Sequence, residues 1–598
     1  MKKLNLDSSW RFQAVEEPFG AIMQGHPEGA ELEAYDDSAW VTLDLPHDYS
    51  ITQPVTNGQV GIGNHNAGQN GYMPGWMVWY RKWVDMECLA GKRYLLQLDG
   101  SYRRTEVWVN EQFVGTQPNG YFSFALDITE ALRPGRNLIA IRVNNLDTPN
   151  CRWYTGTGIY RHVWLLEMNE QHFAHWGLTV TTPDISDETA TVAIRSEVEA
   201  KAGYTVRAKV LCPEGQVAAE SQADGQGVGE VTQELVVAQP KRWTLEQPAL
   251  YRVELELVVD GKTVDTASVP FGIRTIEYKP HVGFLLNGVP TKFKGVCLHH
   301  DAGPIGAAVP KTVWESRLRK LKSIGCNAIR TSHNPPSEEF LDACDEIGFV
   351  VMDEFCDKWE PPHFLDFATE WKRDMRDWIR RDRNHPCIVM WSVGNENDQP
   401  NTLYIRTRTK MLCDEVRRLD PTRVAMIALE RGPDGPVDHA QLLLDSSTDT
   451  AFMGSNYAEQ WYEQILEHDP EALILGTENY IYYSSQADFR EALIEWNPYL
   501  DVLKDDRVMG QFLWTGIDYL GEAHRAWPNI GSSSGLIDMT GHIKPRARPF
   551  QSMWSEQPMV SVAIYENRAQ KPRSMWDFPA IHQAWTLPVG STADDHRR

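Results

Sequence analysis

Two glutamates, Glu396 and Glu478, each close an apolar run of the sequence. A carboxylate at the end of a buried segment costs free energy unless it is paired or used. Two facing carboxylates can cleave a glycosidic bond. One, kept protonated, donates its proton to the leaving oxygen, and the other attacks the anomeric carbon or activates water. The alternative is that each glutamate is a salt-bridged strand terminus. We favour the catalytic interpretation of the pair.

Polar and aromatic residues also close the neighbouring apolar runs. Flat rings at these ends could stack on a sugar, and they belong to Trp359, Trp391, Tyr457, Tyr480 and Trp514. Six further side chains could form a metal cluster instead, namely His299, His300, Asp301, His333, Asp353 and Glu354. Their spacing lacks the H-x-H and H-E-x-x-H patterns of metal sites. We therefore expect them to bind sugar hydroxyls.

The elements that must position these residues are eight short apolar runs that alternate with helical stretches. They cover residues 293–300, 328–332, 349–355, 388–396, 424–429, 452–457, 473–479 and 508–516. This alternation predicts a (β/α)₈ barrel, with a doubly wound open sheet as the alternative. Barrel active sites lie at the carboxyl ends of the strands. Glu396 and Glu478 would end strands 4 and 7, which face each other.

Before the barrel, the apolar pattern alternates every second residue. It predicts a β-sandwich over residues 1–170 and a second, smaller sandwich over 171–275, interrupted by a polar, Gly-rich break at 220–230. The barrel then covers 276–558, and 559–598 is too short for another domain. A Gly-rich stretch at 58–75 is expected to be a long loop, which is a weak hint of function.

Composition limits the classes of protein. The chain has 598 residues, 42% of them hydrophobic, and a net charge of -24. It is globular, and its acidity disfavours nucleic acid and anionic membranes as partners. Nine cysteines without a C-x-x-C pair predict no disulfide framework. No signal peptide or membrane helix is visible, so we expect a cytoplasmic protein.

Four motifs in order resemble glycoside hydrolase family 2, which includes β-galactosidases, β-glucuronidases and β-mannosidases. They are DLPHD at 44–48, NCRWYTGTGIYR at 150–161, RTSHNPP at 330–336 and GNE at 394–396. The resemblance covers about residues 1–558. It implies a jelly-roll sugar-binding domain, an immunoglobulin-like β-sandwich and a catalytic (β/α)₈ TIM barrel, followed by a short C-terminal remnant. It also implies a homo-oligomer and no organic cofactor.

The resemblance further implies roles for individual residues. Glu396 would be the acid/base and Glu478 the nucleophile of a retaining enzyme, whose carboxyl groups stand about 5 to 5.5 Å apart. Asn395 would bind the sugar 2-hydroxyl, His299 and His333 other hydroxyls, and Tyr457 would position the nucleophile. Trp514, Arg330 and Asn150 complete the implied substrate-binding set.

The expected substrate follows from positions at which this sequence differs from members of that family. The β-glucuronidases hold a carboxylate with an Asn-x-Lys motif, but the matching stretch here, 531–536, reads GSSSGL. Residues 514–522 resemble those of the smaller β-galactosidases. The magnesium-binding Glu-x-His of the large β-galactosidases is replaced by Asp357 and Trp359, so no metal is expected. We therefore favour an exo-acting enzyme on neutral β-galactosides.

Three alternatives remain open. A β-glucuronidase or β-galacturonidase would need other basic residues, and Lys544, Arg546 and Arg548 are the candidates. A carbohydrate-binding protein without activity belongs to another class, and the presence of both glutamates counts against it. A metal-dependent barrel hydrolase is the third alternative.

Overall fold

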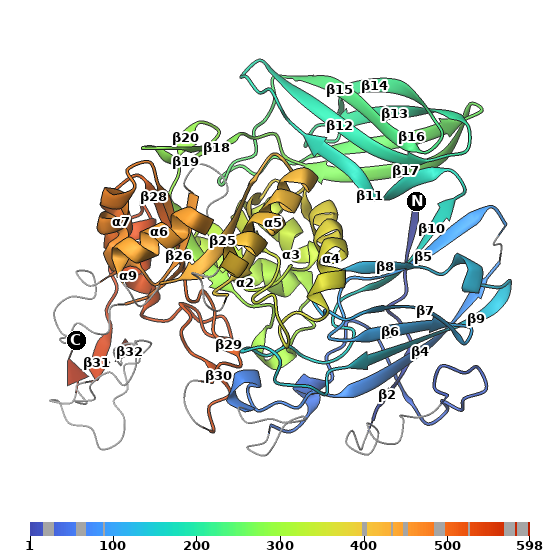
Figure 1. The fold of residues 1–598 in the computed structure, drawn as a ribbon, viewed down its shortest axis with the longest axis horizontal. Coiled ribbons are helices and arrows are strands. Elements are labelled where there is room, and N and C mark those ends of the chain that lie inside the picture. The colour runs from blue at the N-terminus through green and yellow to red at the C-terminus, as the bar shows by residue number, and fades with distance from the viewer. Residues whose placement is uncertain are drawn as a thin grey trace.

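The computed structural model describes residues 1–598 except 16–28, 56–66, 88–89, 398–402, 432–434, 447–451, 483–496, 524–526, 567–580, 583–595 and 598. The chain forms two β-sandwiches and a barrel. Figure 1 shows the N-terminal sandwich and the smaller sandwich on one side, with the barrel and its helices beside both. Half of the Gly-rich stretch at 58–75, residues 58–66, lies outside the described residues.

The N-terminal sandwich consists of two antiparallel sheets that pack their apolar faces together. Its alternating strands bury every second side chain, among them Trp10, Tyr80 and Ile141. The four-stranded sheet has the order β1 (Lys2–Asn5), β10 (Val163–Asn169), β5 (Lys92–Leu98) and β8 (Phe124–Asp127). The six-stranded sheet has the order β3 (Val41–Leu43), β2 (Trp10–Ala14), β4 (Met77–Met86), β9 (Gly135–Asn144), β6 (Thr105–Val109) and β7 (Gln112–Gln117).

The smaller sandwich pairs a three-stranded sheet with a four-stranded one. The first has the order β11 (His172–Thr181), β12 (Thr189–Glu199) and β15 (Gly229–Ala238). The second has the order β14 (Val217–Gln226), β13 (Gly203–Leu211), β16 (Tyr251–Val259) and β17 (Lys262–Phe271). The prediction of a polar break at 220–230 is wrong, because residues 220–226 belong to β14. As an edge strand, β14 has no fully buried residue and needs few apolar side chains.

The predicted barrel is confirmed as a closed ring of eight parallel strands in chain order. These are β21 (Phe293–Leu298), β22 (Ala328–Thr331), β23 (Val350–Glu354), β24 (Ile388–Asn395), β25 (Val424–Glu430), β26 (Phe452–Asn456), β27 (Leu473–Asn479) and β28 (Val508–Leu513). Nearly every strand residue is buried, which explains the continuous apolar runs. Helices outside the ring are α2 (Lys311–Ser323), α3 (Glu338–Ile347), α4 (Phe367–Asp382), α5 (Leu403–Leu419), α6 (Pro436–Ser446), α7 (Tyr462–His468), α8 (Tyr499–Leu503) and α9 (Ala547–Trp554).

Short elements complete the described chain. Before the barrel lies a sheet of β18 (Ile276–Lys279), β19 (Gly283–Leu286) and β20 (Val289–Pro290), and after it the pair β29 (Tyr519–Leu520) and β30 (Gly531–Ser532). The described part of 559–598 contains a small sheet of β31 (Ile564–Glu566), β32 (Ile581–His582) and β33 (His596–Arg597). Single 3₁₀ turns occur at Ser50–Thr52, Ala67–Asn70, Thr129–Ala131, Gly303–Ile305 and Glu459–Trp461. No described helix has the length and apolar character to cross a membrane.

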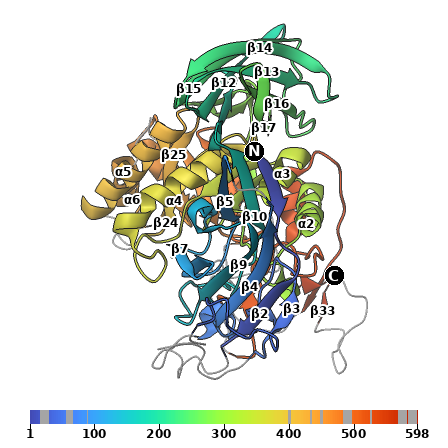
Figure 2. The same ribbon diagram turned by 90° about the vertical axis from the view of Figure 1, so that its right-hand side faces the viewer.

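Helix α4 joins the barrel to both sandwiches. Its Asp374 accepts hydrogen bonds from Gln117 (3.0 Å) and Asn119 (3.1 Å) of the N-terminal domain. Its Arg380 pairs with Glu197 of the smaller sandwich at 2.8 Å. Figures 1 and 2 show α4 on the side of the barrel that faces these domains. Buried polar contacts therefore join the barrel to the N-terminal sandwich, and a partly buried ion pair joins it to the smaller one.

We expect Gly348→Ala to destabilise the junction between the smaller sandwich and the barrel. Gly348 ends α3 with a φ of 84°, and an added Cβ would overlap the carbonyl oxygen of Leu245. The left-handed backbone alone costs about 1–2 kcal/mol for a residue with a Cβ. Gly215→Ala is the matched control, since Gly215 has a φ of 83° and open space around it. Calorimetry should show a clearly lower melting temperature for Gly348→Ala. Equal melting temperatures in the two variants would show that the close approach of Leu245 does not constrain this position.

Candidate active site

Glu396 and Glu478 lie where the barrel strands end. Glu478 is the penultimate residue of β27, and its exposed fraction is 3%. Glu396 follows β24 directly and has a left-handed φ of 44°. The pairing of β24 with β25 shifts register between Ser392 and Asn395, and such irregularities redirect side chains at strand ends. The backbone amide of Glu396 donates to the carbonyl of Ala428 at 2.9 Å, which secures this conformation.

Glu478 is held by a cation and a hydroxyl. Arg330 Nη1 donates to its Oε1 at 2.8 Å, and the Tyr457 hydroxyl donates to its Oε2 at 2.8 Å. Burial and the nearby charge of Glu396 raise the pKa of Glu478 to about 7, against the opposing effects of Arg330, His333 and Tyr457. Two neighbouring carboxylates of this kind resist carrying two charges together.

A chain of hydrogen bonds connects the two glutamates. Asn456 Nδ2 donates to Glu396 Oε1 at 3.0 Å and to Asn395 Oδ1 at 3.1 Å. Arg330 Nη2 donates to the same Asn395 oxygen at 2.9 Å. A continuous chain of hydrogen bonds therefore runs from Glu396 through Asn456, Asn395 and Arg330 to Glu478. The structure thus brings together Arg330, Asn395, Glu396, Tyr457 and Glu478, all of which the sequence singled out.

Arg330 is fully buried, and protein groups surround its guanidinium. Besides Glu478 and Asn395, it pairs with Glu354 at 2.7 Å and donates to the carbonyl of Thr477 at 3.0 Å. Glu354 also contacts His333 Nδ1 at 2.6 Å. All three nitrogens of the guanidinium therefore donate to protein carboxylates.

Three buried imidazole nitrogens in this region have no hydrogen-bond partner among the described residues. They are both nitrogens of His299 and Nε2 of His333. Trp514 stacks on His333 with 5.2 Å between ring centroids, and His299 lies between Trp153 and Tyr519 at 4.9 and 4.3 Å. Burial lowers the pKa of His299 well below its usual value, so the ring is neutral. Unsatisfied buried groups require a partner, and a bound ligand with polar groups would supply it.

Arg152, to which the sequence alone gave no role, reaches the site from the N-terminal domain. It pairs with Asp357 at 2.8 Å and with Glu522 at 3.2 Å. Asp357 also accepts from Asn395 Nδ2 at 3.0 Å, so Arg152 acts on Asn395 through it. The motif at 150–161 was the only signal for this residue, because strand patterns do not show which loop of another domain meets the barrel.

Asn150 lies close by but contacts only its own domain among the described hydrogen bonds. Its amide donates to Asn145 at 2.8 Å, and its oxygen accepts from Tyr102 at 2.9 Å. These contacts support the loop that carries Arg152. Lys358, which also had no role from the sequence, donates to the carbonyl of Asn395 at 3.0 Å and to that of Glu396. It therefore fixes the backbone of the proposed acid/base.

The residues at the magnesium position do not suit a metal ion. Both oxygens of Asp357 accept from Arg152, and Trp359 donates its indole N–H to the carbonyl of Val393 at 2.9 Å. Within the described residues, the cluster with metal-ligand geometry is Asp345, His385 and Cys387. It lies at the amino end of β24, and hydrogen bonds within the cluster already join Asp345 to His385 (2.6 Å) and to the amide of Cys387 (2.8 Å).

Comparison with known proteins places this geometry in a class. Residues 2–169 match the sugar-binding domain of glycosyl hydrolases family 2, residues 176–274 match the second domain of that family, and residues 279–556 match its TIM barrel domain. The β-galactosidase BoGH2A of Bacteroides ovatus is 32% identical over 95% of this chain and 73% of its own length. A β-glucuronidase of Bacteroides fragilis is 26% identical over 87% of this chain and 80% of its own length.

Solved structures agree with the fold. A glycosyl hydrolase family 2 member from Bacteroides cellulosilyticus superposes with a TM-score of 0.87 at 31% identity, over 98% of this chain and 76% of that one. The chain belongs to glycoside hydrolase family 2 and is a glycoside hydrolase. The chain covers only 58% and 52% of the lengths of two further relatives.

We expect Asp357→Asn to reduce hydrolysis while the fold is retained. The change weakens the ion pair with Arg152 and the hold on Asn395, and small misplacements in such sites cost up to about 100-fold in rate. Asp420→Asn is a matched control, since Asp420 is buried and paired with Arg423 away from the site. Rates on an aryl glycoside should fall at least tenfold for Asp357→Asn alone. Equal rates in both variants would remove Asp357 from the site.

Proposed function

We propose that the protein is a retaining exo-β-galactosidase, which releases terminal non-reducing β-D-galactose through a covalent intermediate on Glu478. The observation that carries this proposal is the unequal environment of the two linked glutamates. Glu478 receives a guanidinium and a phenol, whereas Glu396 receives the neutral amide of Asn456. The guanidinium and the phenol favour the ionised form of Glu478, and they oppose the rise in its pKa that burial and the charge of Glu396 cause. This environment suits Glu478 to the role of nucleophile and leaves the role of acid/base to Glu396.

The mechanism follows from that division. Glu478 Oε attacks the anomeric carbon while Glu396 gives its proton to the departing oxygen, so the glycosidic bond breaks as the ester bond forms. Glu396, now a carboxylate, then takes a proton from water. The resulting hydroxide attacks the anomeric carbon, galactose leaves, and Glu478 recovers its charge. Asn395 is hydrogen-bonded to Arg330 and Asn456, which contact Glu478 and Glu396, and in this mechanism it binds the 2-hydroxyl through each step.

The charges around the site favour a neutral sugar. Among the described residues, the carboxylates of Glu354, Asp357, Glu396, Glu478 and Glu522 outnumber the cations of Arg152, Arg330 and Lys358. A uronate would add another negative charge to this group. Lys544, a candidate uronate ligand, is held by Asp518 at 2.6 Å and by the carbonyl of Ser533 at 2.8 Å.

Initial rates on p-nitrophenyl β-galactoside and p-nitrophenyl β-glucuronide, with chelator present, test the proposal. We expect release from the galactoside, and a fall of at least about 10⁴-fold on Glu478→Gln, because the covalent step is lost. Glu459→Gln is the matched control, since Glu459 is also buried and follows the neighbouring strand β26.

Other outcomes would point to other functions. Release from the glucuronide alone would show a β-glucuronidase, whose carboxylate is then bound by residues outside the 531–536 segment. Loss of activity in chelator would indicate a metal-dependent hydrolase. Unchanged activity in Glu478→Gln would overturn the assignment of the nucleophile.

We also expect Glu396→Gln to shift the pH dependence. Attack needs ionised Glu478, so activity is lost as the pH falls through the pKa of that group. Removing the charge of Glu396 removes one cause of the raised pKa. The acidic limb of kcat/KM should therefore move to lower pH, measured on an aryl glycoside whose leaving group needs no proton. If the acidic limb of kcat/KM does not move, the charges of the two carboxylates do not interact.

A further inference from the structure

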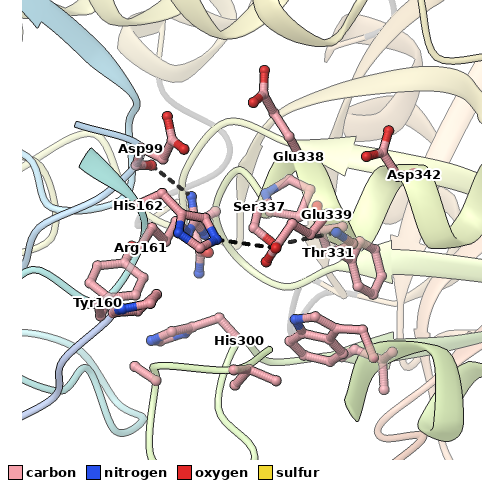
Figure 3. A pocket seen from close by; sticks show the side chains of 18 of the residues that line it. Asp99, Tyr160, Arg161, His162, His300, Thr331, Ser337, Glu338, Glu339 and Asp342 are labelled. Atoms are coloured by element: carbon pink, nitrogen blue, oxygen red, sulfur yellow. Dashed lines mark hydrogen bonds and ion pairs between the residues drawn. The ribbon is translucent and has the colours of Figure 1, made fainter. Parts of the chain in front are cut away.

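A second cavity lies between the N-terminal sandwich and the barrel, behind the active site. It has a volume of about 390 Å³, within the range of small-molecule sites. Figure 3 shows its two sides: Tyr160, Arg161 and His162 from the N-terminal domain, and His300, Thr331 and the start of α3 from the barrel. We call it the interdomain cavity. Neither Glu396 nor Glu478 lines it.

Two buried polar groups on the wall of the interdomain cavity have no hydrogen-bond partner among the described residues. They are Nδ1 of His300 and the amide nitrogen of Asn334. The exposed fractions of these residues are 8% and 3%. Leaving a buried polar group without a hydrogen bond destabilises the protein. A ligand with hydroxyl groups would satisfy both, since a hydroxyl both donates and accepts.

The charges of the cavity are close to balanced. His162 lies between Asp7 (2.6 Å) and Glu339 (3.1 Å), and Lys3 is 3.7 Å from Glu338. Arg161 donates to the carbonyls of Tyr121 and Pro335 at 3.2 and 3.0 Å. Burial raises the pKa values of Asp99 and Asp342, which favours their neutral forms. A strongly charged ligand would therefore gain little electrostatic attraction in the interdomain cavity.

Aromatic rings supply the rest of the wall. Tyr160 lies beside His300, with 5.8 Å between ring centroids, and Trp314 packs against Phe340 at 5.1 Å. Tyr160, Trp314 and Phe340 all line the cavity and are almost fully buried. Flat apolar rings combined with unsatisfied polar groups suit a molecule that has hydroxyls at its rim and C–H bonds on its faces. The geometry points to a second, non-catalytic site for a neutral monosaccharide.

This site shares its wall with the active site. His299 and His300 both line the interdomain cavity, and Ser332 lines it next to His333 in the chain. The ring of His299 also packs against His333, whose Nε2 lies 3.5 Å from Glu478 Oε1. A sugar bound in the cavity would therefore brace the backbone that carries the two active-site histidines. The second site does not depend on whether galactose is the catalytic substrate.

Equilibrium dialysis with labelled D-galactose and D-glucose on the full chain counts the bound sugar. We expect the wild type to bind one more sugar per chain than His300→Phe. That change removes the polar nitrogens and keeps the ring contact with Tyr121, which is 5.1 Å away. If the active site also binds the sugar, the counts are two and one, and otherwise one and zero. The difference is thus independent of the proposed function.

The controls separate loss of the site from loss of the fold. His281→Phe makes the same substitution at an exposed histidine and should bind like the wild type. Trp314→Leu removes an aromatic wall and should weaken the second site at least tenfold, with a melting temperature measured for each variant. Equal counts for the wild type and His300→Phe, with either sugar, would overturn the inference. Binding of inorganic phosphate in place of the sugars would overturn its neutral character.

Discussion

The active site depends on one buried cation. Arg330 has no exposed surface, and it is paired with Glu354 and Glu478 while it also holds Asn395. Removing a guanidinium from water costs several kcal/mol, which only well-placed carboxylates and carbonyls can offset. The arrangement in turn orients Glu478 and favours its charged form against the effect of burial. The remaining groups, from Tyr457 to Asn456, are arranged around the charges that Arg330 fixes.

The barrel is predictable from the sequence because its physics is regular. Parallel strands covered on both sides must be apolar throughout, and the eight runs follow from that requirement. Polar residues at the ends of such runs stand out, and Glu396, Glu478 and their neighbours are recognisable for this reason. The edge strand β14 escapes prediction for the opposite reason. With one edge and much of its surface in water, it carries no apolar pattern to detect.

The supporting residues of the site cannot be predicted in the same way. Arg152 comes from a loop about 200 residues before Asp357, and no periodicity connects the two. The left-handed backbone of Glu396 and the shifted register of β24 also have no signature in residue type. Such features arise from tertiary packing, so a sequence shows which groups are available and leaves their contacts undetermined.

The bridge from Arg152 to Asp357 has a consequence for how the molecule matures. A barrel that closed before the N-terminal sandwich docked would contain both glutamates and Arg330, yet Asn395 would lack the bracing that Arg152 supplies. The hydrogen-bond network around Asn395 is therefore complete only when the N-terminal sandwich is docked on the barrel, so the active site is shared between two domains.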